Sequence, residues 1–183
     1  MTFNELNEKL GGTEKQADWK QAKGGGWIHE SAKVENDELI LDNAIVWGII
    51  SGNAQVSGDA QVSGNAQVSG NAWVYGNAQV SGNAQVSGNA QVSGDALVSG
   101  DAQVSGDALV SGDAWVSSPL FIIGSKFSLT NRKHGHIQIG CYCKPFKWWL
   151  GKEALELAKK QNFSPQQIKE YRTYVKLFIA IGK

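Results

Sequence analysis

Between Ile50 and Ile122 the chain repeats one six-residue unit, Val-Ser-Gly-Asn/Asp-Ala-Gln, almost without change. A short fixed period indicates a solenoid, because a single unit cannot bury its apolar side and neighbouring units must stack. Within a unit, alanine and valine alternate with glutamine and serine, as in a strand with one buried face. The Gly-Asn or Gly-Asp pair then turns the chain, since these residues tolerate positive φ. Each unit therefore predicts one short strand and one corner.

The apolar phase begins before the regular repeat. Ile28, Val34, Ile40 and Val46 are six residues apart, a step of four leads to Ile50, and the spacing of six then continues. We expect a domain of stacked coils over residues 25–124, between an N-terminal helical segment over residues 1–24 and a C-terminal cap over residues 125–183.

The unit also fits a known signature: an aliphatic residue, a small one, two variable ones, a small one and one variable one. Over residues 27–124 the chain resembles the left-handed β-helix family of hexapeptide-repeat proteins. That resemblance implies a left-handed parallel β-helix with three units in a triangular coil of about 18 residues. Coils would stack about 4.8 Å apart. The expected fold class is mainly β, with an α+β cap of short strands and two helices.

Residues 18 apart would then lie above one another, so the outward residue before each valine falls on one of three faces. These residues are Gln55, Trp73, Gln91 and Leu109 on the first face; Gln61, Gln79, Leu97 and Trp115 on the second; and Gln67, Gln85, Gln103 and Phe121 on the third. Leu97 below Trp115 predicts an exposed apolar step. The aromatic and leucine replacements predict a contact surface, which comprises Trp73, Leu97, Leu109, Trp115 and Phe121.

The flanks carry helix and strand signals. Before the repeat we expect helices over Asn4–Leu10 and Thr13–Lys23, followed by a Gly24–Gly26 hinge. After it we expect strands over Phe127–Leu129 and His136–Ile139 and a helix over residues 145–161. A second helix would begin at Ser164, with Pro165 at its first position and Gln167 completing a capping box. Its apolar positions fall at helical spacing: Ile168, Tyr171, Val175 and Phe178.

Composition excludes several classes of protein. The 17 Lys and Arg residues balance the 17 Asp and Glu residues, so no net field draws the chain to nucleic acid or an anionic membrane. No apolar run approaches the roughly 18 residues of a membrane span, and the polar N-terminus is unlike a secretory signal. Cys141 and Cys143 are too close for a disulfide framework. We therefore expect a cytoplasmic protein.

Catalysis is not expected. Acyltransferases that resemble this chain in the repeat use a histidine base on the prism, but residues 44–124 contain no histidine. His29, in the first coil, is typical of a structural histidine near the solenoid entry. Two alternatives stay open: an acyltransferase-like hexapeptide transferase, and a protein that sequesters a small ligand such as a nucleotide in pockets between protomers.

A second histidine and cysteine cluster stands in the cap. His134 and His136 form one pair two residues apart, and Cys141 and Cys143 form another. Imidazole and thiolate suit zinc, but the pairs have opposite parity, so only a bend at Gly140 would bring them together. We expect no cofactor and keep this zinc set as the alternative.

Two charged features complete the surface. Corner acids follow one another late in the repeat, at Asp95, Asp101, Asp107 and Asp113, and predict a solvated acidic collar rather than a cation site. In the cap, basic and aromatic residues interleave, and those expected at an interface are Arg132, Lys133, Lys147 and Trp148. Because the net charge is zero, this patch favours a protein partner over nucleic acid.

The whole plan resembles hexapeptide-repeat proteins carried by phages and prophages. The resemblance rests on the Gly25-Gly26-Trp27 entry, the hexads, the Ile139-Gly140-Cys141 segment and the terminal Glu170–Tyr174 stretch. It implies a structural or interaction protein, a host protein as partner, and interference with a host defence. Relatives of the fold commonly form trimers, so a homotrimer is expected.

Overall fold

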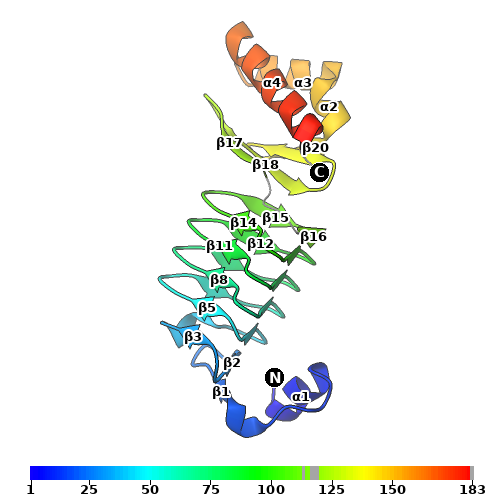
Figure 1. Ribbon diagram of the computed structural model, residues 1–183. Coiled ribbons are helices and arrows are strands. Elements are labelled where there is room, and N and C mark those ends of the chain that lie inside the picture. The colour runs from blue at the N-terminus through cyan, green and yellow to red at the C-terminus, as the bar shows by residue number, and fades with distance from the viewer. Residues whose placement is uncertain (113, 116–119, 182–183) are drawn as a thin grey trace. The chain divides into compact units, whose positions relative to one another are not determined.

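The computed structural model describes residues 1–112, 114–115 and 120–181 (Figure 1). The chain forms two compact units. The solenoid unit comprises Met1–Asp107 and Ser111–Ser118, and the C-terminal unit comprises Ala108–Val110 and Pro119–Lys183. Each unit has its own core.

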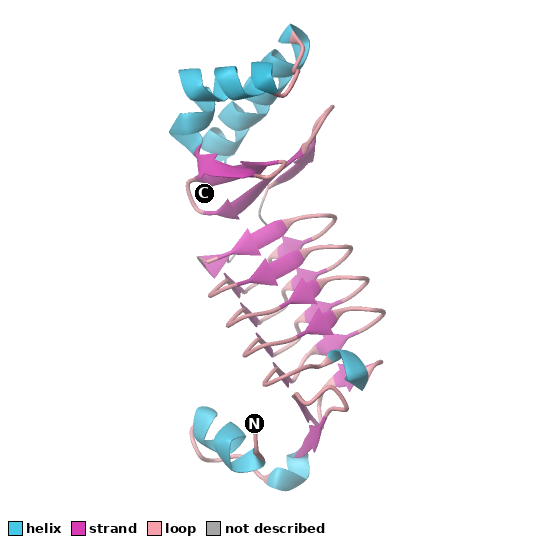
Figure 2. Ribbon diagram, turned by 180° about the vertical axis from the view of Figure 1, so that it is seen from behind, coloured by secondary structure: helices cyan, strands magenta, loops and turns pink. Residues whose placement is uncertain are grey.

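The solenoid unit is a parallel β-solenoid of about five turns, with short strands joined by corners (Figure 2). One face has the order β1-β2-β4-β7-β10-β13-β16. Its strands are β1 (Trp19–Gln21), β2 (Trp27–His29), β4 (Ile45–Val46), β7 (Gln61–Val62), β10 (Gln79–Val80), β13 (Leu97–Val98) and β16 (Ala114–Trp115). The left-handed sense of the coil stays a prediction from the hexapeptide resemblance.

The other two faces continue the same phase. The second has the order β3-β5-β8-β11-β14, and the third contains β6, β9 and β12. Their bounds are β3 (Lys33–Val34), β5 (Ile49–Ile50), β8 (Gln67–Val68), β11 (Gln85–Val86), β14 (Gln103–Val104), β6 (Gln55–Val56), β9 (Trp73–Val74) and β12 (Gln91–Ser93). β15 (Leu109–Ser111) follows in the phase of the third face. Gln61 pairs with Gln79 and Gln79 with Leu97, which confirms three hexads in each coil.

The first coil is shorter than the rest on two faces. Val34 pairs with Ile50 and Ile40 with Val56, each 16 residues apart, whereas Ile28 pairs with Val46 at the regular 18. The missing two residues are those of the four-residue step between Val46 and Ile50. The apolar phase read from the sequence therefore holds through the irregular coil.

The core of the solenoid is a column of small apolar side chains. The inward alanines and valines from Ala44 to Val104 are at most 1% exposed. At the corners, glycines stack on glycines: Gly88 has φ +71°, and a Cβ added there would lie 2.9 Å from the backbone nitrogen of Gly106. Glycine is required here by both the left-handed backbone and the close approach of consecutive coils.

Hydrogen bonds between coils run in one direction along these corners. The backbone N–H of Asn71 donates to the carbonyl of Gly88 in the next coil at 2.8 Å. Side chains repeat this order, since Asn53 Nδ2 donates to Asn71 Oδ1 at 3.3 Å and Asn71 Nδ2 to Asn89 Oδ1 at 3.2 Å. The corners are thus held by amide ladders as well as by the backbone.

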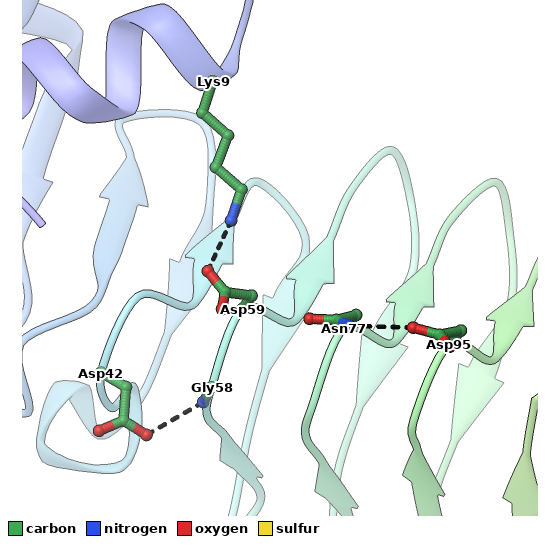
Figure 3. Close-up of polar contacts among 6 residues, drawn as sticks. All are labelled: Lys9, Asp42, Gly58, Asp59, Asn77 and Asp95. Carbon is green, nitrogen blue, oxygen red and sulfur yellow. Dashed lines mark hydrogen bonds and ion pairs between the residues drawn. The ribbon is translucent and has the colours of Figure 1, made fainter.

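The corner acids end these ladders. Asn77, Asn83 and Asn89 each donate from Nδ2 to the aspartate one coil further on, at 2.9–3.0 Å. Figure 3 shows the Asn77–Asp95 bond. Since an ionised carboxylate accepts but cannot donate, aspartate can terminate a ladder but cannot continue it. The predicted collar is therefore hydrogen-bonded at Asp95, Asp101 and Asp107, and Asp113 lies outside the described residues.

The N-terminal end differs from the prediction. α1 (Phe3–Lys9) is present, with a capping box between Thr2 and Glu5. The expected helix over Thr13–Lys23 is wrong: the chain forms a 3₁₀ turn, η1 (Gln16–Asp18), and then β1, which pairs antiparallel with β2. A strand there satisfies the open edge of the first coil, which a helix would leave unpaired.

The glycine run Gly24–Gly26 is packed rather than hinge-like. A Cβ on Gly24 would lie 2.6 Å from the carbonyl oxygen of Ile40, and the N–H of Gly26 donates to that same oxygen at 3.1 Å. A second 3₁₀ turn, η2 (Asp37–Leu39), completes this coil. Close backbone contact explains the glycines, and the predicted hinge is wrong.

Two register predictions for the C-terminal end of the repeat are wrong. In β16, Ala114 pairs with Leu97 and Trp115 with Val98, so the backbone is shifted by one residue and Ala114 takes the register position predicted for Trp115. β16 ends its face, so only one neighbouring strand holds its register. Phe121 does not extend the face of Gln67, Gln85 and Gln103 either, because it lies in an antiparallel sheet of the C-terminal unit.

That sheet has the order β17-β18-β19-β20 and packs with three helices. The bounds are β17 (Phe121–Ile123), β18 (Ser128–Lys133), β19 (His136–Ile139), β20 (Tyr142–Pro145), α2 (Phe146–Leu150), α3 (Lys152–Lys160) and α4 (Pro165–Ile181). The strand over His136–Ile139 is confirmed, whereas the helix expected over residues 145–161 is divided at Gly151, whose backbone is extended.

The last helix confirms its sequence signals. The N–H of Ser164 donates to Gln167 Oε1, and the N–H of Gln167 donates to Ser164 Oγ, which is the predicted capping box. Tyr171, Val175 and Phe178 are buried in the core of the C-terminal unit. The capping box therefore identified the start of α4, and the 3.6-residue period identified its buried face.

Candidate functional site

Trp73 forms the most distinctive surface of the solenoid unit. It occupies a glutamine position of the repeat, on β9, and is paired with Gln55 on one side and Gln91 on the other. Its side chain is 40% exposed, whereas the valine that follows it is fully buried. A large aromatic residue thus replaces a polar one without changing the strand or the coil.

The exposed indole is held in place by its neighbours. Trp73 Nε1 donates to Ser57 Oγ at 3.1 Å, and its ring centroid lies 4.4 Å from that of Tyr75, with 35° between the planes. Tyr75 itself replaces a repeat serine. We call the five residues Gln55, Ser57, Trp73, Tyr75 and Gln91 the Trp73 surface. None of them is charged, so this is an ordered aromatic surface bordered by amide and hydroxyl groups.

The other predicted interaction residues lie on several different elements. Leu97 and Leu109 are half-buried on β13 and β15, and Phe121 is half-buried on β17. The side chains of Trp115, Arg132 and Lys133 lie outside the described residues. The predicted residues of the solenoid and of the cap are therefore not members of one element or one phase.

On α2, Lys147 is exposed and Trp148 half-buried. The ammonium group of Lys144 lies 5.5 Å from the Trp148 ring centroid, a cation–π contact. Trp149 is buried and its Nε1 donates to the carbonyl of Ile137 at 2.9 Å, so it belongs to the core. The interleaved basic and aromatic residues thus divide between core and surface.

The histidine and cysteine pairs lie around one hairpin. His136 Nδ1 is 3.0 Å from the carbonyl oxygen of His134, and Cys143 pairs across the strands with Gln138. Cys141 is exposed at the turn, and both thiols are free. Among the described residues, no group of three or more His, Cys, Asp or Glu side chains is arranged to hold a metal ion. The bend at Gly140 exists, but it does not assemble the zinc set.

His29 is engaged by its surroundings. Its ring lies edge-on to Trp19, with centroids 5.0 Å apart, and its Nδ1 accepts a hydrogen bond from the backbone N–H of Ser31 at 3.2 Å. A backbone N–H can only donate, so in the neutral ring the proton is on Nε2. The basic nitrogen of His29 is therefore the one bonded to Ser31, and the structural role of this residue stays a prediction.

The C-terminal unit contains an apolar pocket that sequence reasoning missed. Its volume is about 110 Å³, and it lies among α3, α4 and the β19–β20 turn. Residues that line it include Phe127, Ile139, Cys141, Ala158, Arg172 and Val175. These residues share no period or motif, so no signal along the chain could have brought them together.

Comparison with known proteins identifies the class of the repeat. A family model described as the YdcK beta solenoid repeat matches residues 60–76, 66–82, 84–100, 90–103 and 102–118. These stretches lie inside the repeat and support a β-solenoid repeat protein. No curated protein and no solved structure matches the chain. Within the described part of the chain, no helix has the length and apolar character needed to cross a membrane.

Proposed function

We propose that this protein is a non-enzymatic β-solenoid scaffold that presents the Trp73 surface to a protein partner. The observation that carries the proposal is the exposed indole of Trp73, which stands between Gln55 and Gln91 and is fixed by Ser57 and Tyr75. Tryptophan and tyrosine are typical of the few residues that dominate binding energy at protein interfaces. A side chain already held in one position loses little conformational entropy on binding.

The regular coils support a scaffold role. Side chains selected for separate contacts would differ from coil to coil, whereas here the same valine, serine, glycine and alanine recur. Backbone ladders and corner amide ladders connect each coil to the next. The central coils then act as a rigid spacer, and recognition falls to the positions that depart from the repeat.

The chemistry of the surface favours a protein over a nucleic acid. A nucleic acid strand would need cations for its phosphates next to the aromatic rings. The Trp73 surface instead surrounds its rings with Gln55, Ser57 and Gln91, which suit the backbone and polar side chains of a protein. Nδ1 of His29 already accepts a hydrogen bond from the backbone N–H of Ser31, which argues against His29 as the base of an acyl transfer.

The proposal extends to partner and compartment. The resemblance to phage and prophage proteins supports a host protein as partner and interference with a host defence as the role. Two free thiols support a reducing, cytoplasmic setting. We further propose a homotrimer, as in relatives of the fold, and native mass spectrometry of gently purified protein tests that assembly: a monomer would contradict it.

The repeat itself supplies the test variants. The double variant Trp73→Gln, Tyr75→Ser restores the consensus hexad and should leave the fold intact. We expect it to weaken partner binding by about 30-fold or more, since an interface tryptophan commonly contributes ~2 kcal/mol or more. The measurement is quantitative capture from bacterial lysate followed by titration of the purified partner.

A matched control is Gln79→Ala, which removes a repeat glutamine from another face. It should bind like the unmodified protein. Equal binding by all three proteins would contradict the role of the Trp73 surface. A rise in melting temperature with acetyl-coenzyme A would contradict the non-enzymatic proposal, because any ligand that binds the folded state stabilises it.

A further inference from the structure

Three elements supply most of the lining of the apolar pocket in the C-terminal unit. The β19–β20 turn contributes Gly140, Cys141 and Tyr142; α3 contributes Ala154, Leu155, Leu157 and Ala158; and α4 contributes Ile168, Tyr171, Arg172 and Val175. An apolar cavity of about 150 Å³ in a protein interior can stay dry and bind benzene. At about 110 Å³, with an opening to the outside, this pocket has room for one ring or a short branched chain.

Two polar side chains in its walls, those of Tyr171 and Trp149, are bonded to the protein. Tyr171 Oη donates to the carbonyl of Phe127 at 2.6 Å and accepts the N–H groups of Lys126 and Phe127. Trp149 Nε1 donates to Ile137. With these two groups satisfied, the walls present mainly hydrocarbon to an incoming molecule, so water gains little by entering and an apolar body is favoured.

Arg172 adds one charged group to this lining. Its Nη2 donates to the carbonyl of Leu150 at 3.3 Å, which uses one of the five N–H donors of the guanidinium. Over the described residues, no carboxylate forms an ion pair with Arg172. A half-buried cation beside an apolar pocket is complementary to an anion attached to an apolar body.

We propose that this pocket binds a small amphipathic carboxylate. The ring or branched chain of the ligand, about six carbons in size, fills the space between α3 and α4. Its carboxylate accepts hydrogen bonds from Arg172. The site is separate from the Trp73 surface, so it takes the protein beyond scaffolding and can fail or hold independently of the partner.

The test uses a matched pair of probes, 3-phenylpropanoate and 3-phenylpropanol, which share the ring and differ in charge. The protein used in this test carries Cys143→Ser, so that alkylation reports only on Cys141, an exposed thiol that lines the pocket. Both probes should slow alkylation of Cys141 and raise the melting temperature. The acid should bind about tenfold more tightly than the alcohol, as expected for hydrogen bonds to a charged partner.

Two further variants test separately how the ring and the carboxylate of the probe contribute to binding. Arg172→Gln should weaken the acid about tenfold and leave the alcohol unchanged, which also shows that the pocket still folds. Ala158→Phe should fill the space and abolish protection by both probes. If it does not fold, Ala158→Leu replaces it.

Three outcomes would overturn the proposal. If neither probe protects Cys141, the pocket is not a binding site. If the acid and the alcohol bind equally well, Arg172 does not bind the carboxylate. Protection that survives in the filled variant places binding elsewhere. The variant Trp73→Gln should bind both probes normally, so a failure of the partner surface leaves this test intact.

Discussion

The repeat coils and the C-terminal unit use similar apolar residues in opposite ways. In the coils, Val62, Val80 and Val98 occupy one environment repeated along the solenoid, each paired with the next. In the C-terminal unit, Leu129 and Phe178 lie in a single core where no two positions are equivalent. The difference teaches that position in the repeat decides a residue's environment in the coils, whereas in the C-terminal unit the contacts between its sheet and its helices decide it as well.

This contrast extends to stability. A solenoid gains stability from contacts between nearest neighbours, so damage to one coil is shared with its neighbours. A core of unlike residues depends on each large side chain. Variants in the two units should therefore differ in size and in what unfolds.

The largest effect is expected from Phe178→Ala. Phe178 is fully buried in α4, and its loss should cost the C-terminal unit about 3–5 kcal/mol. Calorimetry should show that unit melting first, while circular dichroism retains the β signal of the coils. The neighbouring Leu177 is 42% exposed, so Leu177→Ala should cost no more than about 0.5 kcal/mol. If the coils unfold in the same transition, the two units do not unfold independently, and the prediction is wrong.

A smaller effect is expected from Gly88→Ala, at about 2–3 kcal/mol. It combines a side chain at positive φ with a contact 2.9 Å from the Gly106 nitrogen. Gly112 has the same φ of +71°, but no atom of the described residues lies within 4 Å of the added Cβ, so Gly112→Ala should cost only about 1 kcal/mol. Urea unfolding measures both. Equal costs would mean that backbone conformation alone, and not coil stacking, requires glycine.

The direction of the amide ladders predicts an asymmetry of about 1 kcal/mol. Asn89→Asp removes the donor to Asp107 and sets two carboxylates against each other, whereas Asp107→Asn keeps the bond. Only the first variant should lower the urea midpoint at pH 7. Its defect should shrink in acid, where protonation removes the repulsion. Destabilisation by both variants alike would argue against a directional ladder.

The smallest effect is expected from Lys9→Met. Lys9 Nζ lies 2.8 Å from Asp59 Oδ1, and this hydrogen bond, partly opposed by desolvation, holds the pKa of Asp59 below its usual value (Figure 3). Both side chains are partly exposed, so the pair contributes at most about 0.5–1 kcal/mol.

The sign of its pH dependence follows from the lowered pKa. The contribution of Asp59 is complete above its unfolded pKa of about 3.9 and is lost as the pH falls through the folded value. The melting temperatures of the Lys9→Met variant and the unmodified protein should therefore differ at pH 7 and converge in strong acid. Lys15→Met, which removes a lysine without an ion pair among the described residues, is the control. If the difference in melting temperature persists in acid, Lys9 stabilises the protein through packing and not through its ion pair with Asp59.

Much of the solenoid could be predicted because its information is local and repeated. Alternation within Ala54–Ser57 defines a strand and Gly58-Asp59 defines a corner, and the 18-residue coil that the hexapeptide resemblance implied defines the faces. The same holds for α4, whose cap at Ser164 and apolar period are complete within the helix. Where a signal is contained in neighbouring residues, sequence reasoning identified the element and its buried face.

Other features depended on partners distant in the chain. The segment around Trp19 forms a strand because β2 offers an unpaired edge, and Gly24 is glycine because Ile40 passes against it. Phe121 follows the hexad phase but pairs with Thr130 in the antiparallel sheet. In each case a local pattern was overruled by a backbone hydrogen bond or a steric contact that the pattern does not contain.

The sequence by itself determined the strand and corner of each unit, the six-residue apolar period, and the glutamine position of the repeat at which Trp73 stands. Only the tertiary structure decided that Ser57 and Tyr75 hold that indole, that asparagines form directional ladders ending at aspartates, and that Arg172 lines an apolar pocket. The physical reason is the range of the interactions. Hydrophobic period and turn preference act between residues close in the chain, whereas packing and side-chain hydrogen bonds act between residues that folding brings together.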